Sequence, residues 1–279
     1  MTLSGADVRR LLTEHGLAPS RARGQNFVVD PNTVRRVARL ASVGPGDRVV
    51  EIGAGLGSLT LALADTGASV TAVEVDSRLV PVLRSVVEPA GVTVVEGDAL
   101  RLDWSALLGG AAGDWVLVAN LPYNVATPLI ADLLDGVPPI GRMLVMVQRE
   151  VGERLAASAG DDAYGAVSVK VAYWAEARVV GRVPPTVFHP VPKVESALVR
   201  IDRRPAPAVA VEVDRAWLFR LVAAGFGQRR KMLRRSLAGL VGPEAFAAAG
   251  IRPEARAEEL SVVDWGRLAA CTSNGPRPS

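Results

Sequence analysis

The alternation of apolar and polar positions along the chain predicts a domain in which strands and helices take turns. Short apolar runs bounded by turn residues are typical of buried strands, and stretches with helical spacing separate several of them. The seven expected strands lie at residues 48–52, 69–75, 92–95, 115–119, 143–147, 167–173 and 197–201. This order indicates an α/β fold with a largely parallel, Rossmann-like sheet of seven strands.

Helical patterns dominate the C-terminal part of the chain. Asp30 followed by Pro31 already predicts one helix start before the sheet. Residues 203–211, with two prolines, are typical of a linker, and the helices expected after it lie at residues 217–226, 229–240, 243–249 and 253–270. We therefore expect a sheet domain at residues 1–204 and a small all-α domain at residues 205–279, which ends in a disordered tail from residue 272.

Polar residues stand at the ends of four successive expected strands. Glu51, Glu74, Asp98 and Asn120 follow one another at intervals of 22 to 24 residues, which is one strand and one helix per interval. Parallel strands bring their carboxyl ends to one edge of a sheet, where α/β proteins bind ligands. An acid about 20 residues beyond a glycine loop is also placed to hold a ribose diol. The spacing predicts a nucleoside-binding edge.

A glycine-rich turn joins the first of these strands to the helix after it. Gly53, Gly55 and Gly57 alternate directly after Glu51, and glycine allows the backbone to approach a ligand closely. The spacing differs from the Gly-x-Gly-x-x-Gly pattern that holds a pyrophosphate. It favours an adenosyl ligand without a pyrophosphate, and the alternative is a tight turn with no ligand.

The segment Asn120-Leu121-Pro122-Tyr123 carries the most specific chemistry in the sequence. An adenine amine is a poor nucleophile because its lone pair is delocalised into the ring. Hydrogen bonds to the Asn120 side-chain oxygen and a backbone carbonyl would favour a pyramidal nitrogen, and Tyr123 could stack on the ring. Phe188, in the Pro-rich loop 183–194, would close the other side if it is exposed, whereas in a plain crossover it would be buried.

These motifs resemble the S-adenosylmethionine-dependent ribosomal RNA adenine dimethyltransferases, and among them the KsgA-like branch. The resemblance covers residues 21–240 and includes Glu-x-Gly-x-Gly-x-Gly from Glu51, Glu74, Asp98, Asn-Leu-Pro-Tyr from Asn120, and the segments 24–27, 187–196 and 228–231. It implies dimethylation of two adjacent adenosines near the 3′ end of 16S ribosomal RNA during assembly of the small subunit. The implied partner is the RNA of a pre-30S particle.

The resemblance also assigns roles to matching positions. Asn26 and the backbone of Val28 and Gly53 would hold the methionine part of the donor, Glu74 its ribose and Asp98 its adenine amine. The expected donor-binding set is Asn26, Val28, Glu51, Gly53, Gly55, Glu74, Asp98 and Asn120. The expected catalytic set at the target base is Asn120, Leu121, Tyr123 and Phe188. Val28 stands where the family usually has leucine, which leaves a backbone contact possible.

Charge adds a second candidate surface. The net charge is only +3, but the isoelectric point near 9.4 favours an anionic partner. Five cations gather on the expected helix at 229–240, where Arg230 and Arg234 would stand one turn apart, and two more precede the first motif. The expected RNA-binding set is Arg229, Arg230, Lys231, Arg234, Arg235, Arg21 and Arg23. The alternative is a solvated face in a chain encoded by a GC-rich genome.

Composition narrows the remaining classes of function. A single cysteine, Cys271, excludes an internal disulfide framework, and with only two histidines a zinc site is not expected. The absence of a long apolar run and of a signal-peptide pattern predicts a cytoplasmic protein without a membrane partner. No coiled coil or repeat is visible, so we expect a monomer.

Three other functions stay open at this point. One is the related methylation of 23S ribosomal RNA that confers macrolide resistance, and another is a non-catalytic ribosome assembly factor. A methyltransferase for small molecules is the third, and it predicts no salt-dependent binding of RNA.

Overall fold

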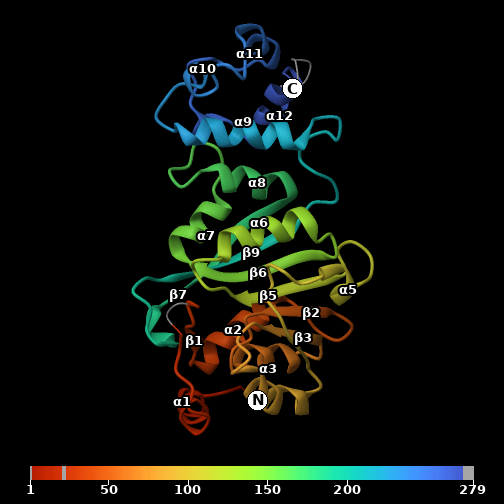
Figure 1. Ribbon diagram of the computed structural model, residues 1–279, viewed down its shortest axis with the longest axis vertical. Helices are drawn as coiled ribbons and strands as arrows, with labels where there is room; N and C mark the ends of the chain where they lie inside the picture. Colours follow the sequence, from red (N-terminus) through yellow and green to blue (C-terminus); the bar gives the residue numbers. More distant parts are fainter. Residues whose placement is uncertain (1, 21–22, 273–279) are drawn as a thin grey trace. The chain divides into compact units, whose positions relative to one another are not determined.

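The computed structural model describes residues 2–20 and 23–272 of the chain (Figure 1). The strands are β1 (Phe27–Val28), β2 (Arg48–Ile52), β3 (Ser69–Glu74), β4 (Thr93–Glu96), β5 (Trp115–Asn120), β6 (Ile140–Gln148), β7 (Ala175–Val183), β8 (Phe188–His189) and β9 (Ser196–Arg203). The helices before β7 are α1 (Gly5–Glu14), α2 (Pro31–Ala41), α3 (Ser58–Ala64), α4 (Val80–Val87), α5 (Trp104–Leu108), α6 (Ala126–Gly136), α7 (Arg149–Ala156) and α8 (Ala166–Trp174). Those after β9 are α9 (Arg215–Gly227), α10 (Leu233–Ser236), α11 (Pro243–Ala249) and α12 (Val262–Ala270).

Seven strands form one sheet in the order β4-β3-β2-β5-β6-β9-β7. Strands β2 to β6 pair in parallel, and β9 returns antiparallel to β6. The register aligns the carboxyl ends, since Ile52 pairs with Val73 on one side and with Ala119 on the other. This is the α/β fold with a seven-stranded sheet that the apolar pattern predicts, and it brings the polar strand ends to one edge.

A second, two-stranded ribbon joins distant parts of the chain. In it β1 pairs antiparallel with β8, with Phe27 opposite His189 and Val28 opposite Phe188. The ribbon fixes the segment before α2 to the Pro-rich loop that precedes β9.

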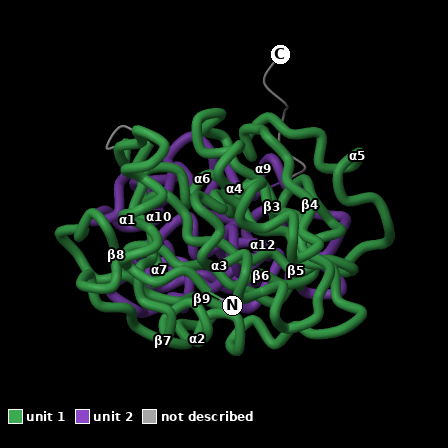
Figure 2. Tube along the Cα trace, turned by 90° about the horizontal axis from the view of Figure 1, so that it is seen from below, with its two compact units in different colours: residues 1–152, 178–203 green, residues 153–177, 204–279 purple. Residues whose placement is uncertain are grey.

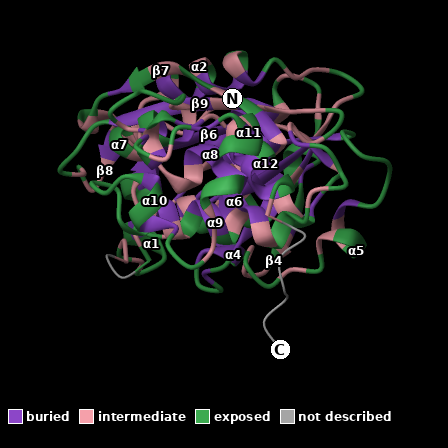
Figure 3. Ribbon diagram, turned by 90° about the horizontal axis from the view of Figure 1, so that it is seen from above, coloured by how far each residue is buried: buried purple, intermediate pink, exposed green. Residues whose placement is uncertain are grey.

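Helix α2 shows how local sequence and packing agree. The Asp30 side chain accepts hydrogen bonds from the backbone N–H groups of Asn32 and Thr33, which caps the helix as predicted. Its apolar side, which includes Val34 and Val37, is buried in a core shared with the sheet (Figure 3). The opposite side carries polar residues and arginine.

The structure corrects one expected strand. Residues 167–173 lie in helix α8, and the seventh strand of the sheet is β7, which follows that helix directly. A short apolar run does not distinguish a buried strand from a buried helix by itself. Here Val169 and Tyr173, one helical turn apart, pack into the core of the C-terminal helices, and that packing selects the helix.

Two compact units share the chain (Figure 2). One comprises residues 1–152 and 178–203, and the other residues 153–177 and 204–279. The chain crosses between the two units three times, and the expected boundary at 204 lies at the third crossing. Residues 153–177 also belong to the helical unit. Their side chains supply part of its core, around the fully buried Trp265.

The expected helix at 229–240 is reduced to α10. The backbone around it is engaged by another segment of the same unit, because the Leu233 N–H donates to the Ala255 carbonyl and the Arg234 N–H to the Pro253 carbonyl. Residues 253–256 therefore form a loop where a helix was expected. Among the described residues no helix is long and apolar enough to cross a membrane. The expected disordered tail, apart from residue 272, lies outside the described residues.

Candidate functional site

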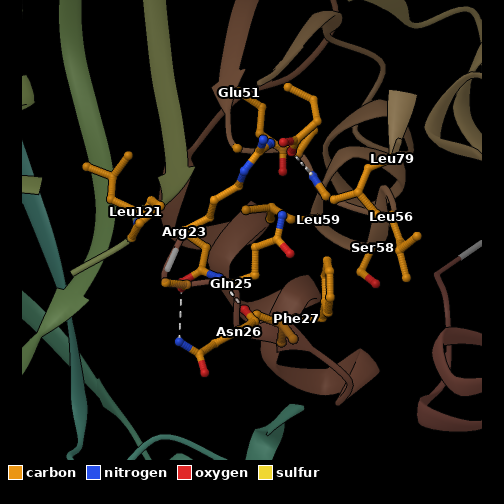
Figure 4. A pocket seen from close by; sticks show the side chains of 18 of the residues that line it. Arg23, Gln25, Asn26, Phe27, Glu51, Leu56, Ser58, Leu59, Leu79 and Leu121 are labelled. Atoms are coloured by element: carbon orange, nitrogen blue, oxygen red, sulfur yellow. Dashed lines mark hydrogen bonds between the residues drawn. The ribbon is translucent and has the colours of Figure 1, made fainter. Parts of the chain in front are cut away.

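A cavity of about 90 Å³ lies at the carboxyl ends of β2, β3 and β5, entirely within the sheet-containing unit (Figure 4). Its wall includes the glycine turn, the acidic end of β3, the Asn120–Tyr123 segment and residues 23–28, which we call the entry segment. Phe27, Leu56, Leu59 and Leu79 give one side an apolar lining (Figure 4). The strand ends that the spacing predicts to meet do meet, except that Asp98 is not part of the wall.

The glycine turn has its N–H groups satisfied by the protein itself. The N–H groups of Gly53 and Ala54 donate to the Val73 carbonyl, and that of Gly55 to a Glu74 carboxylate oxygen at 2.8 Å. Gly55 has φ of +60°, and a Cβ there would lie 3.0 Å from the Phe27 ring. A turn whose donors are engaged is not a phosphate cradle, which fits a nucleoside ligand without a pyrophosphate.

Two buried carboxyl groups border the cavity. Glu51 is 2 % exposed, its Oε2 has no hydrogen-bond partner among the described residues, and burial raises its pKa to about 8. Glu74 accepts the N–H groups of Gly55 and Asp76, and burial raises its pKa as well. A buried acceptor without a partner is costly, so a ligand that brings a hydroxyl or ammonium group to Glu51 suits this site.

Asp76 holds the entry segment against the sheet. Its carboxylate accepts a hydrogen bond from Gln25 Nε2 at 3.0 Å and forms ion pairs with Arg23 at 3.3 Å and Arg78 at 2.8 Å. The Arg78 guanidinium, together with Gln25 and Arg23, holds the pKa of Asp76 well below its usual range. These contacts hold the entry segment along one side of the cavity.

Asn120 links the entry segment to the end of β5. Its Nδ2 donates to the Asn26 carbonyl at 2.9 Å, which leaves the Oδ1 acceptor for a ligand, while Asn26 Nδ2 donates to the Gly24 carbonyl. Leu121 is buried and its N–H donates to the Met146 carbonyl. The backbone of this segment is thus fixed on both sides.

Tyr123 is held at its hydroxyl end. The phenol oxygen and Ser196 Oγ are 2.8 Å apart in a hydrogen bond, and Ser196, the first residue of β9, is fully buried. Burial raises the pKa of Tyr123, so the phenol stays protonated at neutral pH. The hydrogen bond fixes the direction of an aromatic ring that lines the cavity.

Two expected site residues lie outside the cavity wall. Phe188 is 2 % exposed and packs in the core between α2 and the sheet, which is the arrangement of a structural crossover. Asp98 has a half-exposed side chain that accepts the Leu100 N–H and lies 3.8 Å from Arg101. Their assigned contacts with the target base and the adenine amine stay predictions.

The basic cluster does not form the continuous helix face that the spacing suggested. Residues 228–232 make a turn before α10, so Arg230 and Arg234 are not successive positions of one helix. Arg229 is engaged by the protein, donating to Glu258 and to the Asp162 carbonyl, both at 2.7 Å. Arg230, Lys231 and Arg235 are exposed, and Arg234 lies 3.8 Å from Glu254. Arg21 lies outside the described residues.

Sequence reasoning missed two residues of this site. Asp76 was visible as the first acid after β3, and the charge of the neighbouring Arg78 was a signal that it forms ion pairs. Ser196 ends the segment 187–196 that carries the resemblance, but its contact with Tyr123 could not be seen in the sequence, because only the fold joins the two residues across 73 positions. Within the described residues there is no group of three or more His, Cys, Asp or Glu side chains placed to hold a metal.

Comparison of the sequence with known proteins assigns the chain to a family. The family model for ribosomal RNA adenine dimethylase matches residues 20–273. A ribosomal RNA small subunit methyltransferase A from Thermobifida fusca is 48% identical over 278 residues, covering 96% of this chain and 95% of the relative. A protein with the same name from Cutibacterium acnes is 49% identical over 280 residues, with 95% and 93% covered.

Solved structures agree with this assignment. The 23S rRNA methyltransferase ErmE is 26% identical, with a TM-score of 0.68 over 89% of this chain and 100% of its own. A dimethyladenosine transferase from Plasmodium falciparum, at 23% identity, has a TM-score of 0.71 over 86% and 94% of the two chains, which supports the fold. With a family match over most of its length and relatives that share nearly half of its residues, the chain belongs to the ribosomal RNA adenine dimethylase family.

Proposed function

We propose that this protein transfers methyl groups from S-adenosylmethionine to N6 of two adjacent adenosines near the 3′ end of 16S ribosomal RNA. The observation that carries the proposal is the Asn120–Tyr123 segment, which lies beside a nucleoside-type cavity with an unpartnered buried acceptor. The relatives at 48% and 49% identity are named as small-subunit enzymes, which favours 16S over 23S RNA as the substrate.

The donor side of the site is built from the cavity wall. Asn26 and the backbone of Val28 and Gly53 hold the methionine part of the methyl donor. The carboxyl oxygen of Glu51 that has no partner among the described residues accepts a hydrogen bond from the bound ligand. Glu74 keeps lone pairs for the ribose hydroxyls beside its two backbone hydrogen bonds. Bound S-adenosylmethionine supplies a methyl group on a positively charged sulfur, which is already activated for transfer.

The target side positions the adenine amine. Asn120 Oδ1 and a neighbouring backbone carbonyl accept its hydrogens, which favours a pyramidal nitrogen, and Tyr123 stacks on the ring. No strong base is needed, because the methylated amine loses its proton to solvent. Phe188 reaches the other face of the ring only if the Pro-rich loop rearranges, since its side chain is buried.

The remaining surface selects the RNA. The exposed cations Arg230, Lys231 and Arg235, with Arg234, contact phosphates from the helical unit. We propose a monomer that acts in the cytoplasm on a pre-30S particle and uses no metal.

The test is methylation of defined ribosomal particles. Purified protein is incubated with labelled S-adenosylmethionine and under-methylated small subunits, and the digested nucleosides are analysed by mass spectrometry. Dimethyladenosine at two adjacent positions of 16S RNA is the expected result. Label on 23S RNA alone would replace the substrate with that of the ErmE type, and tight binding without label would indicate a non-catalytic assembly factor.

A variant pair tests the role of Asn120. Asn120→Ala removes the acceptor and should lower the rate of methyl transfer by about 100-fold, while Asn120→Asp keeps an acceptor and should retain more activity. RNA affinity should be unchanged in both. Equal losses in the two variants would contradict the assigned role of Oδ1.

A further inference from the structure

One face of the sheet-containing unit gathers arginine side chains that take no part in the cavity wall. They come from α2, from the start of β6 and from the edge strand β7. We call this set the α2 arginine face: Arg35, Arg36, Arg39, Arg142, Arg178 and Arg182. None of the sequence motifs above predicted it, because its members are spread over 148 positions.

Hydrogen bonds join the three segments of the face. Arg36 Nη1 donates to the Arg182 carbonyl at 2.9 Å, and Arg142 Nη2 donates at 3.1 Å to the carbonyl of Ser42, the residue after α2. Gly181 permits the first contact, because a Cβ there would collide with the Arg36 guanidinium.

Negative charge on this face is scarce. Arg142 of β6 stands directly opposite Asp202 of β9 in the strand register, so both side chains project from the same face of the sheet. The Asp202 carboxylate is already shared, since it accepts from Arg200 Nε at 2.9 Å and lies 3.6 Å from Arg178. Two further acids nearby are also engaged, since Asp30 caps α2 and Glu176 of β7 lies 3.1 Å from Arg204. The face keeps a clear excess of positive charge.

Two arginines of α2 repel each other on its exposed side. Arg35 and Arg39 are exposed and one turn apart, and like charges at this spacing destabilise an isolated helix. Guanidinium groups on one surface match the phosphates of a nucleic acid, which release counterions when neutralised. Helix α2 begins at Pro31, three residues after Val28 of the cavity wall, so a chain bound here continues next to the site.

We propose that the α2 arginine face binds the phosphate backbone of the substrate RNA beside its target adenosines. This inference rests on the proposed function, and it adds a second RNA-binding surface, on the sheet-containing unit, to the cations of the helical unit. An acidic protein of the particle is the alternative occupant, and the proposed activity favours RNA.

The test compares two triple variants with the same loss of charge. Arg35→Gln/Arg39→Gln/Arg182→Gln removes exposed cations of the face. The matched control, Arg10→Gln/Arg48→Gln/Arg84→Gln, removes cations that already pair with Glu14, Asp114 and Glu88. A third protein, with lysine at positions 35, 39 and 182, keeps the charge. Binding of a 16S RNA fragment is measured by filter retention at several salt concentrations, and thermal melting checks folding.

We expect the face variant to lower the slope of log K against log salt by about 2, since each phosphate contact contributes about 0.7 to 0.9. Its Kd should rise by up to about 100-fold at 0.1 M salt, while the control and the lysine protein stay near wild type. An unchanged slope for the face variant, or equal losses in the control, would overturn the proposal. Weaker binding to whole subunits with unchanged binding to RNA would assign the face to a protein instead. Failure of the wild type to make dimethyladenosine would refute the proposed function separately, whatever the RNA affinities are.

Discussion

Replacing Glu51 with glutamine should make the protein more stable, and the gain should depend on pH. The folded protein holds this carboxyl at a pKa of about 8, against an ordinary value of 4.5, because burial disfavours the charged form. Between these two values the unfolded chain loses the proton while the folded chain keeps it, so wild-type stability falls as pH rises. The interval corresponds to about 5 kcal/mol at about 1.4 kcal/mol per pH unit, as an upper bound.

Glu51→Gln keeps the shape of the side chain and removes its titration. The free energy of unfolding of the variant relative to wild type should therefore be near its minimum at pH 4.5, rise through pH 6 and 7, and level off above pH 8 at a few kcal/mol. Urea unfolding at pH 5, 6.5, 8 and 9 measures it, and the exposed Glu96→Gln serves as the control for general charge effects. A difference that is the same at every pH would refute the reasoning.

Other contacts give three further predictions. Ser196→Ala and Tyr123→Phe each break the hydrogen bond that directs the Tyr123 ring, so each should lower kcat. The double variant should be no less active than the less active of the two single variants. Additive losses of kcat in a double-mutant cycle would contradict this. Arg203→Met should destabilise the protein by about 3 kcal/mol in urea unfolding, because the half-buried guanidinium donates to four carbonyl groups at the end of α6 and the start of β6. Gly55→Ala should lower the stability of the protein, and it should also lower the affinity for the methyl donor because the added Cβ displaces the aromatic ring of the entry segment. Gly46 also has a positive φ but has open space around it, so Gly46→Ala should lower stability alone.

The sheet was predictable because its signals are local. Each apolar run, its flanking glycines and the polar residue after it are contiguous in sequence, and the parallel register then follows from the regular intervals between Glu51, Glu74, Asp98 and Asn120. The misassigned helix α8 shows the limit, since its apolar residues are compatible with either structure until the packing partners are known.

The site was predictable only in part, for the same reason. The acids and Asn120 could be placed at a strand end from the sequence, whereas the partners of each side chain depend on tertiary contacts. The engagement of Arg229 by Glu258 and the burial of Phe188 arise between segments that the sequence does not show to be neighbours. Charge patterns had the same weakness, since the cations of residues 228–235 were expected on one helix face, whereas residues 228–232 form a turn and only residues 233–235 lie in α10.

The ribbon of β1 and β8 has a consequence for how the two substrates influence each other. One strand of it carries Phe27 and Val28 of the donor wall, and the other carries Phe188 of the Pro-rich loop, so a displacement of either strand is transmitted to its partner. If the entry segment moves outward to admit the donor, the Pro-rich loop, which we propose to contact the target base, moves with it. Binding of donor and RNA should then be cooperative, and the factor by which one raises affinity for the other must be identical in both directions.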